Sequence, residues 1–235
     1  MTNQPENSGQ TAVLQTEKMI GRQKHRDLVA RAVTDNPGCH VFFFPGEGGM
    51  GKTRFLQETG KDVPKMHPHT SREVRWSGVI DLYHPETHSN SGIEQALMKR
   101  LDPQNEYFAA YQAQRQNFEQ QRQAGLTGKE LETLRQALTS SFLKGYQPLA
   151  QSNRLVLTFD TLELVQYEND TVQELCEVQT EALSVKNWFL EMIPQFPNTV
   201  TIFAGRPHLR LQADFQHQFT LKGCSYQTET IERFT

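Results

Sequence analysis

The sequence has few cysteines, no long apolar run and no excess of basic charge. Its three cysteines are Cys39, Cys176 and Cys224, an odd and widely separated set that argues against a disulfide framework and for a reducing, cytoplasmic compartment. The longest apolar runs, such as residues 41–44 and 155–159, fall far short of the roughly 20 residues that a membrane-spanning helix needs. We therefore expect no membrane span, and the polar N-terminus carries no export signal.

The charge balance disfavours nucleic acid as a partner. Lys and Arg total 24 and Asp and Glu total 27 in this chain of 235 residues, which gives a net charge of -3. Proteins dedicated to nucleic-acid binding usually carry a clear basic excess. A local basic patch is still compatible with this balance.

Apolar segments and turn residues alternate along the chain and predict an α/β fold. Residues 1–18 lack apolar periodicity and are interpreted as a disordered leader, so the ordered domain is expected over 19–235. Residues 91–150 are rich in Gln, Glu, Leu and Ala, which predicts a helical-hairpin insert. Strands that alternate with helices predict a mainly parallel sheet covered on both faces. Strands are expected at 39–44, 74–82, 155–160, 199–204 and around 219–221, and helices at 24–35, 52–59, 171–193 and, as a polar stretch, 227–235.

A glycine-rich loop between the first strand and the following helix carries the strongest motif. Residues 46–53, GEGGMGKT, match the phosphate-loop pattern GxxxxGK[ST] in the required context. Its glycines let backbone amides converge on phosphate oxygens, Lys52 supplies a positive charge, and the Thr53 hydroxyl is placed to bind Mg²⁺. The expected nucleotide-binding residues of this loop are Gly46, Glu47, Gly48, Gly49, Met50, Gly51, Lys52, Thr53 and Arg54.

Three polar side chains near the ends of later strands complete the candidate catalytic set. Asp160 ends an apolar strand and is predicted to hold Mg²⁺ with Thr53, with a helix N-cap as the alternative. Glu163 can orient an attacking water or can be a solvated first-turn residue. Arg206 can sense the γ-phosphate if its strand lies between the strands of the loop and of Asp160; otherwise it is a surface arginine. For Asp81, a structural or loop-capping role is preferred.

Taken in order, four segments resemble the STAND signal-transduction ATPases, which are relatives of the NB-ARC and AAA+ groups. They are Ile20-Gly21-Arg22, GEGGMGKT, LVLTFDTLE at 155–163 and TIFAGRP at 201–207. The resemblance covers nearly the whole chain after residue 19. It implies a three-layer αβα P-loop NTPase with a five-stranded sheet of order 5-1-4-3-2, ATP or ADP with Mg²⁺ as cofactors, Gly21 and Arg22 near the base, and Arg206 as a sensor.

Two departures from the family shape the expected function. Thr161 occupies the position after Asp160 where AAA+ enzymes usually have Glu, which favours slow switching over fast hydrolysis. The family also continues into a helical lid, a winged helix and a sensor domain, none of which fits after Leu221. We therefore expect the N-terminal NTPase module of a larger signalling protein, with protein effector domains elsewhere and a nucleotide-dependent homo-oligomer as a further partner.

Three functions remain as hypotheses. The leading one is an ATP-binding, Mg²⁺-dependent and slowly hydrolysing ATPase that acts as a regulatory switch. The second is an origin-recognition-like AAA+ ATPase that binds DNA, against which the net charge of -3 counts. The third is a P-loop small-molecule kinase, which the Gln-rich insert disfavours because a kinase needs a basic lid. ATP is preferred over GTP by resemblance, since no NKxD-type segment is present.

Overall fold

A central five-stranded parallel sheet organises the computed structural model, which describes residues 22–35, 37–66, 72–166 and 179–233. The spatial order β2-β3-β4-β1-β5 is the predicted order 5-1-4-3-2 seen from the opposite edge, and every pairing is parallel. The predicted fold class is therefore confirmed. The strands are β1 (Cys39–Pro45), β2 (Glu73–Asp81), β3 (Asn153–Asp160), β4 (Thr199–Gly205) and β5 (Ser225–Thr228).

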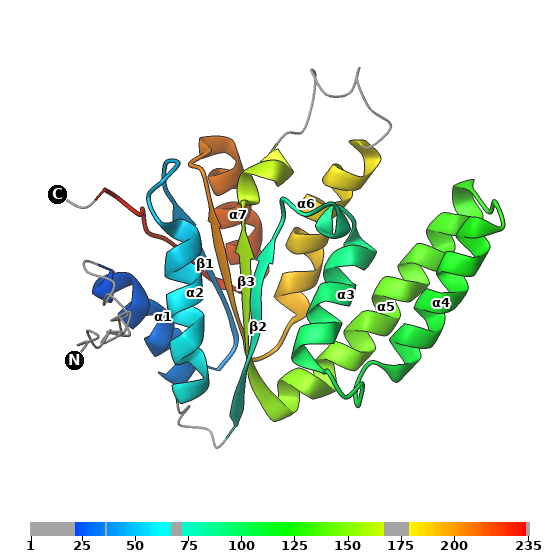
Figure 1. The fold of residues 1–235 in the computed structure, drawn as a ribbon, viewed down its shortest axis with the longest axis horizontal. Helices are drawn as coiled ribbons and strands as arrows, with labels where there is room; N and C mark the ends of the chain where they lie inside the picture. Colours follow the sequence, from blue (N-terminus) through cyan, green and yellow to red (C-terminus); the bar gives the residue numbers. More distant parts are fainter. Residues whose placement is uncertain (1–21, 36, 67–71, 167–178, 234–235) are drawn as a thin grey trace, which may run out of the picture.

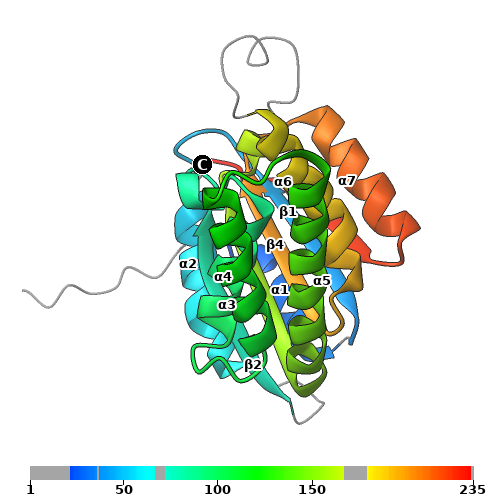
Figure 2. The same ribbon diagram turned by 90° about the vertical axis from the view of Figure 1, so that its right-hand side faces the viewer.

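Helices cover both faces of the sheet and make three layers (Figure 1). One face carries α1 (Gln23–Asp35) and α2 (Lys52–Asp62), and the other carries α3 (Asn90–Leu101), α5 (Gly128–Ser152), α6 (Gln179–Met192) and α7 (Leu209–Leu221). The remaining helix, α4 (Ala109–Gln123), packs on α5 outside these layers (Figure 2). The short 3₁₀ turns are η1 (Val63–Lys65), η2 (Pro85–Thr87), η3 (Leu162–Gln166) and η4 (Ile193–Gln195). No helix of the described segments combines the length and apolar character that crossing a bilayer requires.

The alternation of side chains along β1 builds two separate cores. Val41 and Phe43 point into the core shared with α3, α5, α6 and α7, whereas Phe42 and Phe44 point into the core shared with α1 and α2. Successive strand residues face opposite sides of a sheet, so a continuous apolar run is expected for a strand that is buried on both sides. This double burial holds the phosphate loop, which follows β1 directly, on a rigid base.

The predicted helical insert is present and contains three helices. After β2 the chain forms α3 and then the antiparallel pair α4 and α5 before it enters β3. The pair is held by fully buried aromatic residues: the ring of Phe142 stacks on Phe108 at 5.1 Å and meets Tyr111 edge-on at 5.4 Å. These contacts bury large apolar surfaces and hold α4 against α5.

Two predicted elements near the C-terminus are wrong. Residues 219–221 end α7 instead of forming a strand, because Leu211, Phe215 and Phe219 recur every four residues and are all buried on one helix face. The fifth strand is the polar segment Ser225–Thr228, which no apolar alternation marks. The predicted polar helix at 227–235 is not formed either: the chain leaves β5 at Thr228 and is irregular through residue 233.

The cysteines are closer in space than their sequence positions suggest. His40 of β1 pairs with Ser225 of β5, and Cys39 and Cys224 are the residues directly before them. This pairing brings the two thiol sulfur atoms to 2.7 Å from each other. Wide separation in the sequence therefore does not keep this pair of free thiols apart in the structure. Cys176 and the predicted helix start at 171–178 lie outside the described residues.

Candidate functional site

The phosphate loop has the backbone geometry that its glycines predict. Gly49 and Gly51 adopt φ angles of 78° and 77°, which residues with a side chain rarely adopt. Gly51 is the N-cap of α2, so the first backbone amides of that helix point toward the loop. Gly46 passes so close to the C-terminal segment that an added Cβ would lie 2.8 Å from the Ile231 carbonyl oxygen. The loop is therefore shaped to receive an anionic group.

Lys52 lies over this loop. Its Nζ donates hydrogen bonds to the backbone oxygens of Gly46 at 2.7 Å and Glu47 at 2.9 Å. The ammonium group is thus held at the mouth of the loop, next to the exposed residues Glu47, Gly48 and Gly49. Met50 is half-buried beneath them, and Arg54 is exposed on the first turn of α2.

Thr53 and Asp160 meet at the carboxyl edge of the sheet. Thr53 Oγ1 donates to Asp160 Oδ2 at 2.5 Å, although the two residues are 107 positions apart. Asp160 is 4% exposed, and burial raises the pKa of its carboxyl group, while the hydrogen bonds from Thr53 and from the Thr161 backbone amide act in the opposite direction. A hydroxyl and a carboxylate in contact are oxygen ligands of the type that Mg²⁺ prefers.

A second acidic residue lies beside this pair. Asp81 ends β2 directly opposite Asp160 in the strand pairing, and its negative charge adds to the rise of the pKa of Asp160. Asp81 Oδ1 accepts hydrogen bonds from Thr161 Oγ1 at 2.7 Å and from the Tyr83 backbone amide at 2.9 Å. Asp81 therefore caps the loop that follows β2 and also contacts the residue after Asp160.

Thr161 has an unusual backbone conformation. Its φ angle is 61°, in the left-handed region that β-branched residues strongly disfavour. Such strain costs of order 1–3 kcal/mol and persists only where surrounding contacts hold it. Here the Thr161 hydroxyl bonds Asp81 and its amide bonds Asp160, so the strained residue links the two acidic strand ends.

Glu163 and Arg206 form a pair at the tip of β4. Strand β4 lies between β1 and β3, which is the condition under which Arg206 was expected to face the phosphate loop. Glu163 accepts the Arg206 backbone amide at 3.0 Å, and its other oxygen lies 3.6 Å from Arg206 Nε. Arg206 Nη2 lies 3.8 Å from the place that a Cβ on Gly48 would occupy. The guanidinium group thus lies between Glu163 and the phosphate loop.

Arg22 lies at the other side of the loop. Its guanidinium donates to the Met50 carbonyl oxygen at 3.3 Å and to the Glu232 carbonyl oxygen, and burial lowers its pKa. The C-terminal segment continues along β1, where the Ile231 amide donates to the Pro45 oxygen at 2.7 Å. Arg22 therefore ties the loop to this segment, and Gly21 lies outside the described residues.

Sequence reasoning missed two parts of this site. The loop-capping role expected for Asp81 is present in its hydrogen bond from the Tyr83 amide, but the contact of Asp81 with Thr161 was not foreseen; it follows from the pairing of β2 with β3. Sequence reasoning also missed Ile231, which closes the space behind Gly46. No motif marks that residue, because its position depends on the pairing of β5 with β1.

Comparisons with known proteins find a likeness among solved structures. No protein-family model matches the sequence, and no curated protein matches it. Among solved structures, the chain is similar to the ORC2 protein of Aeropyrum pernix in its ADPNP and ADP complexes, with 10% sequence identity and a TM-score of 0.49. The match covers 91% of this chain and 49% of that one, so the chain spans about half the length of that protein.

Proposed function

We propose that this chain is an ATP-binding, Mg²⁺-dependent and slowly hydrolysing ATPase module that acts as a nucleotide-controlled regulatory switch of a larger signalling protein. The observation that carries the proposal is the contact between Thr53 and Asp160 at 2.5 Å. This contact joins the hydroxyl that follows the phosphate loop to the buried carboxylate at the end of β3. A hydroxyl and a carboxylate are the pair of oxygen ligands that a Mg²⁺-nucleotide site requires.

The residues present fit a Mg²⁺-nucleotide. The loop amides and Lys52 would hold the β and γ phosphates, and Thr53 with Asp160 would hold the cation. When bound, Mg²⁺ would offset the negative charge of the phosphates. Burial and Asp81 raise the pKa of Asp160, so a nearby cation favours the ionised form of this carboxyl group. Arg22, beside Met50, is proposed to lie on the base side together with Gly21.

The contacts of Glu163 support slow turnover. A carboxylate that activates water must be within hydrogen-bond reach of that water. Glu163 is engaged with the backbone amide and the guanidinium of Arg206, and the residue after Asp160 is Thr161, whose hydroxyl bonds Asp81. The carboxylate of Glu163 is therefore occupied by Arg206, and Thr161 has no carboxylate to offer.

Arg206 supplies the switching element of the proposal. Its guanidinium can pair with Glu163, as it does here at 3.6 Å, or turn to a terminal phosphate at the loop beside Gly48. A diphosphate lacks that terminal group, so Arg206 stays with Glu163. The nucleotide state is thereby passed to η3, which carries Glu163. Nucleotide-dependent homo-oligomerisation, effector domains and a cytoplasmic location belong to the same proposal.

The test identifies the nucleotide that the purified chain retains and measures its turnover with and without Mg²⁺. We expect bound ADP, Mg²⁺-dependent ATP binding and a low turnover rate. Lys52→Ala is expected to weaken nucleotide affinity at least about tenfold, because a charged hydrogen-bond donor to phosphate is lost. The matched control is Lys61→Ala on the same helix, since Lys61 is exposed and pairs with Glu58, three residues before it, at 2.7 Å. Equal affinity in the Lys52 and Lys61 variants would overturn the proposal.

A further inference from the structure

A polar hollow lies within the helical insert, away from the phosphate loop. It has a volume of about 380 Å³ and is walled by η2, the start of α3, and the facing sides of α4 and α5. It shares no residue with the candidate nucleotide site. Ligand pockets commonly have volumes of roughly 300–1,000 Å³, so the hollow is large enough for a small molecule.

Positive charge is concentrated in its walls. Four cationic side chains line it from three helices: Lys99 on α3, Arg115 and Arg122 on α4, and Arg135 on α5. The carboxylates that line it are Glu86 and Glu119. Cations therefore outnumber carboxylates in a chain whose overall net charge is -3, so the hollow departs from the charge of the rest of the molecule.

The contacts of the arginines leave capacity for a ligand. Arg122 pairs with Glu119 at 2.9 Å through a side chain that is 58% exposed, and Arg135 lies 3.6 Å from Glu132. Arg115 Nε is buried and has no hydrogen-bond partner within the described residues. The fully buried Glu94 accepts hydrogen bonds from Thr139 and Trp188, and its charge also interacts with the guanidinium group of Arg115. A buried donor without a partner costs free energy, which a bound acceptor would recover.

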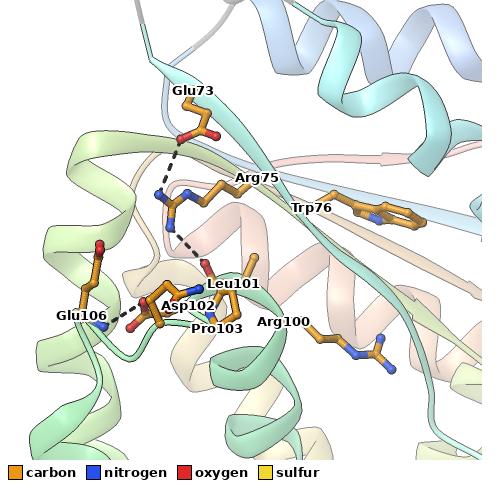
Figure 3. A pocket seen from close by; sticks show the side chains of 9 residues that line it. Glu73, Arg75, Trp76, Arg100, Leu101, Asp102, Pro103 and Glu106 are labelled. Atoms are coloured by element: carbon orange, nitrogen blue, oxygen red, sulfur yellow. Dashed lines mark hydrogen bonds and ion pairs between the residues drawn. The ribbon is translucent and has the colours of Figure 1, made fainter.

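A second hollow, of about 340 Å³, differs from the first in the contacts of its charged side chains (Figure 3). Three of its charged groups, Arg75, Arg100 and Asp102, are engaged with the backbone of the protein. Arg75 donates to the Leu101 carbonyl oxygen at 3.1 Å, and Arg100 donates to the Val79 carbonyl oxygen at 2.7 Å. Asp102 accepts the Tyr107 backbone amide at 2.7 Å. The arginine contacts join β2 to α3, and Asp102 holds the chain entry to α4, so these groups have structural roles.

We propose that the hollow between α3, α4 and α5 binds a small phosphorylated molecule. Guanidinium groups match the geometry of phosphate oxygens and can bind them through two parallel hydrogen bonds. Arg115 and Arg135 approach from different helices, and Lys99 adds a third charge from α3. A concave site of this size encloses a small ligand, whereas a nucleic-acid backbone needs an extended basic surface.

An occupant would contact the turn that leads back to the nucleotide site. Glu86 in η2 lines the hollow, and its neighbour Thr87 donates through Oγ1 to the Asp81 carbonyl oxygen at 3.0 Å. Asp81 in turn accepts the hydroxyl of Thr161 at 2.7 Å. The hollow between α3, α4 and α5 is thus connected to the end of β3 by successive contacts. Binding of a ligand in this hollow does not depend on the function proposed above.

The experiment uses the full chain carrying Lys52→Ala, so that the phosphate loop contributes little to anion binding. Pyrophosphate is titrated into this protein by calorimetry at constant ionic strength set with chloride. We expect saturable binding that weakens as salt rises. Adding Arg115→Gln and Arg135→Gln is expected to lower the affinity at least about tenfold, because charged hydrogen bonds are lost. The matched control Lys144→Gln removes one charge from an exposed position of α5 and is expected to keep the affinity.

Each outcome decides the proposal. Absence of saturable pyrophosphate binding in the Lys52→Ala chain overturns it, as does binding that the two arginine substitutions leave unchanged. Equal binding of malonate would overturn the assignment to phosphate. If the double variant unfolds, Arg122→Gln replaces it, since that side chain is 58% exposed and its loss leaves the core intact. Because Lys52 is already replaced, failure here is separate from failure of the nucleotide proposal.

Discussion

Replacing Asp160 with Asn is expected to separate the stability of the free protein from its response to Mg²⁺-nucleotide. The asparagine keeps the shape of the side chain: its oxygen can accept the Thr161 backbone amide, and its NH2 group can donate to the Thr53 hydroxyl, which in wild type donates to the second carboxylate oxygen. It removes a charge that is 4% exposed and lies opposite Asp81. The free protein should therefore be as stable as the wild type or more stable, while the carboxylate ligand for the cation is lost.

The sign follows from the pKa of Asp160, which burial raises. The folded state then holds its proton more tightly than the unfolded state, so this group reduces stability as pH rises from the ordinary aspartate value through the folded pKa. The asparagine variant lacks this cost. Its unfolding free energy should exceed that of the wild type, or equal it, at neutral pH.

The magnitude of the nucleotide effect follows from binding linkage. Ligand at a hundred times its Kd stabilises a protein by about 2.7 kcal/mol, which corresponds to a rise in Tm of roughly 5–11 °C for a chain of this size. A hundredfold loss of affinity leaves RT ln 2, or about 0.4 kcal/mol. The shift in Tm should then fall to roughly 1–2 °C.

Thermal unfolding with and without ADP and Mg²⁺ measures both quantities. Asp214→Asn is the control, because Asp214 pairs with Lys186 at 3.1 Å on α7 and does not contact the site. That control should retain the full ligand-induced shift. A Mg²⁺-dependent shift as large in Asp160→Asn as in the wild type would refute the assignment of Asp160 to the cation.

Three further outcomes test individual contacts. Glu163→Gln removes the charged partner of Arg206, so the ratio of ATP to ADP affinity should rise in equilibrium binding; an unchanged ratio would contradict the switching role. Burial is the main cause that raises the pKa of Glu94 to about 7. Between pH 4.5 and about pH 8 the unfolding free energy of the wild type should therefore fall by on the order of 3 kcal/mol more than that of Glu94→Gln. Urea unfolding at several pH values measures this difference, and parallel pH curves for the two proteins would contradict it. The sulfur atoms of Cys39 and Cys224 lie 2.7 Å apart, so oxidised glutathione should convert the two thiols to a disulfide and release two molecules of reduced glutathione. The disulfide should stabilise the chain by about 2–4 kcal/mol. Mass spectrometry detects the bond and Tm measures the stabilisation, and Cys39→Ser, which cannot form this bond, is the control.

The two proposed sites divide the chemistry of the molecule between its two parts. The phosphate loop, Asp160 and Arg206 lie at the carboxyl edge of the sheet, where strand ends converge. The basic hollow lies in the helical insert between β2 and β3. Asp81, at the end of β2, contacts both the residue after Asp160 and the turn that borders the hollow.

The local features of this protein were determined by its sequence. The phosphate loop was recognisable because its backbone conformation requires glycines at set positions, and Gly49 and Gly51 adopt the expected φ angles. The strands β1, β3 and β4 were recognisable because strands buried on both faces carry short, mostly apolar runs. The end of α7 was predicted as a strand around residues 219–221, although the four-residue period of Leu211, Phe215 and Phe219 was present in the sequence.

The arrangement between distant segments was decided only by the tertiary structure. The contact of Asp81 with Thr161, the engagement of Glu163 by Arg206, the approach of Ile231 to Gly46 and the proximity of the two thiols all depend on which strands pair and in which register. The same is true of the basic hollow, whose cations come from three helices. Sequence periodicity specifies which face of an element is buried, but the partner that buries it is chosen by packing of the whole chain.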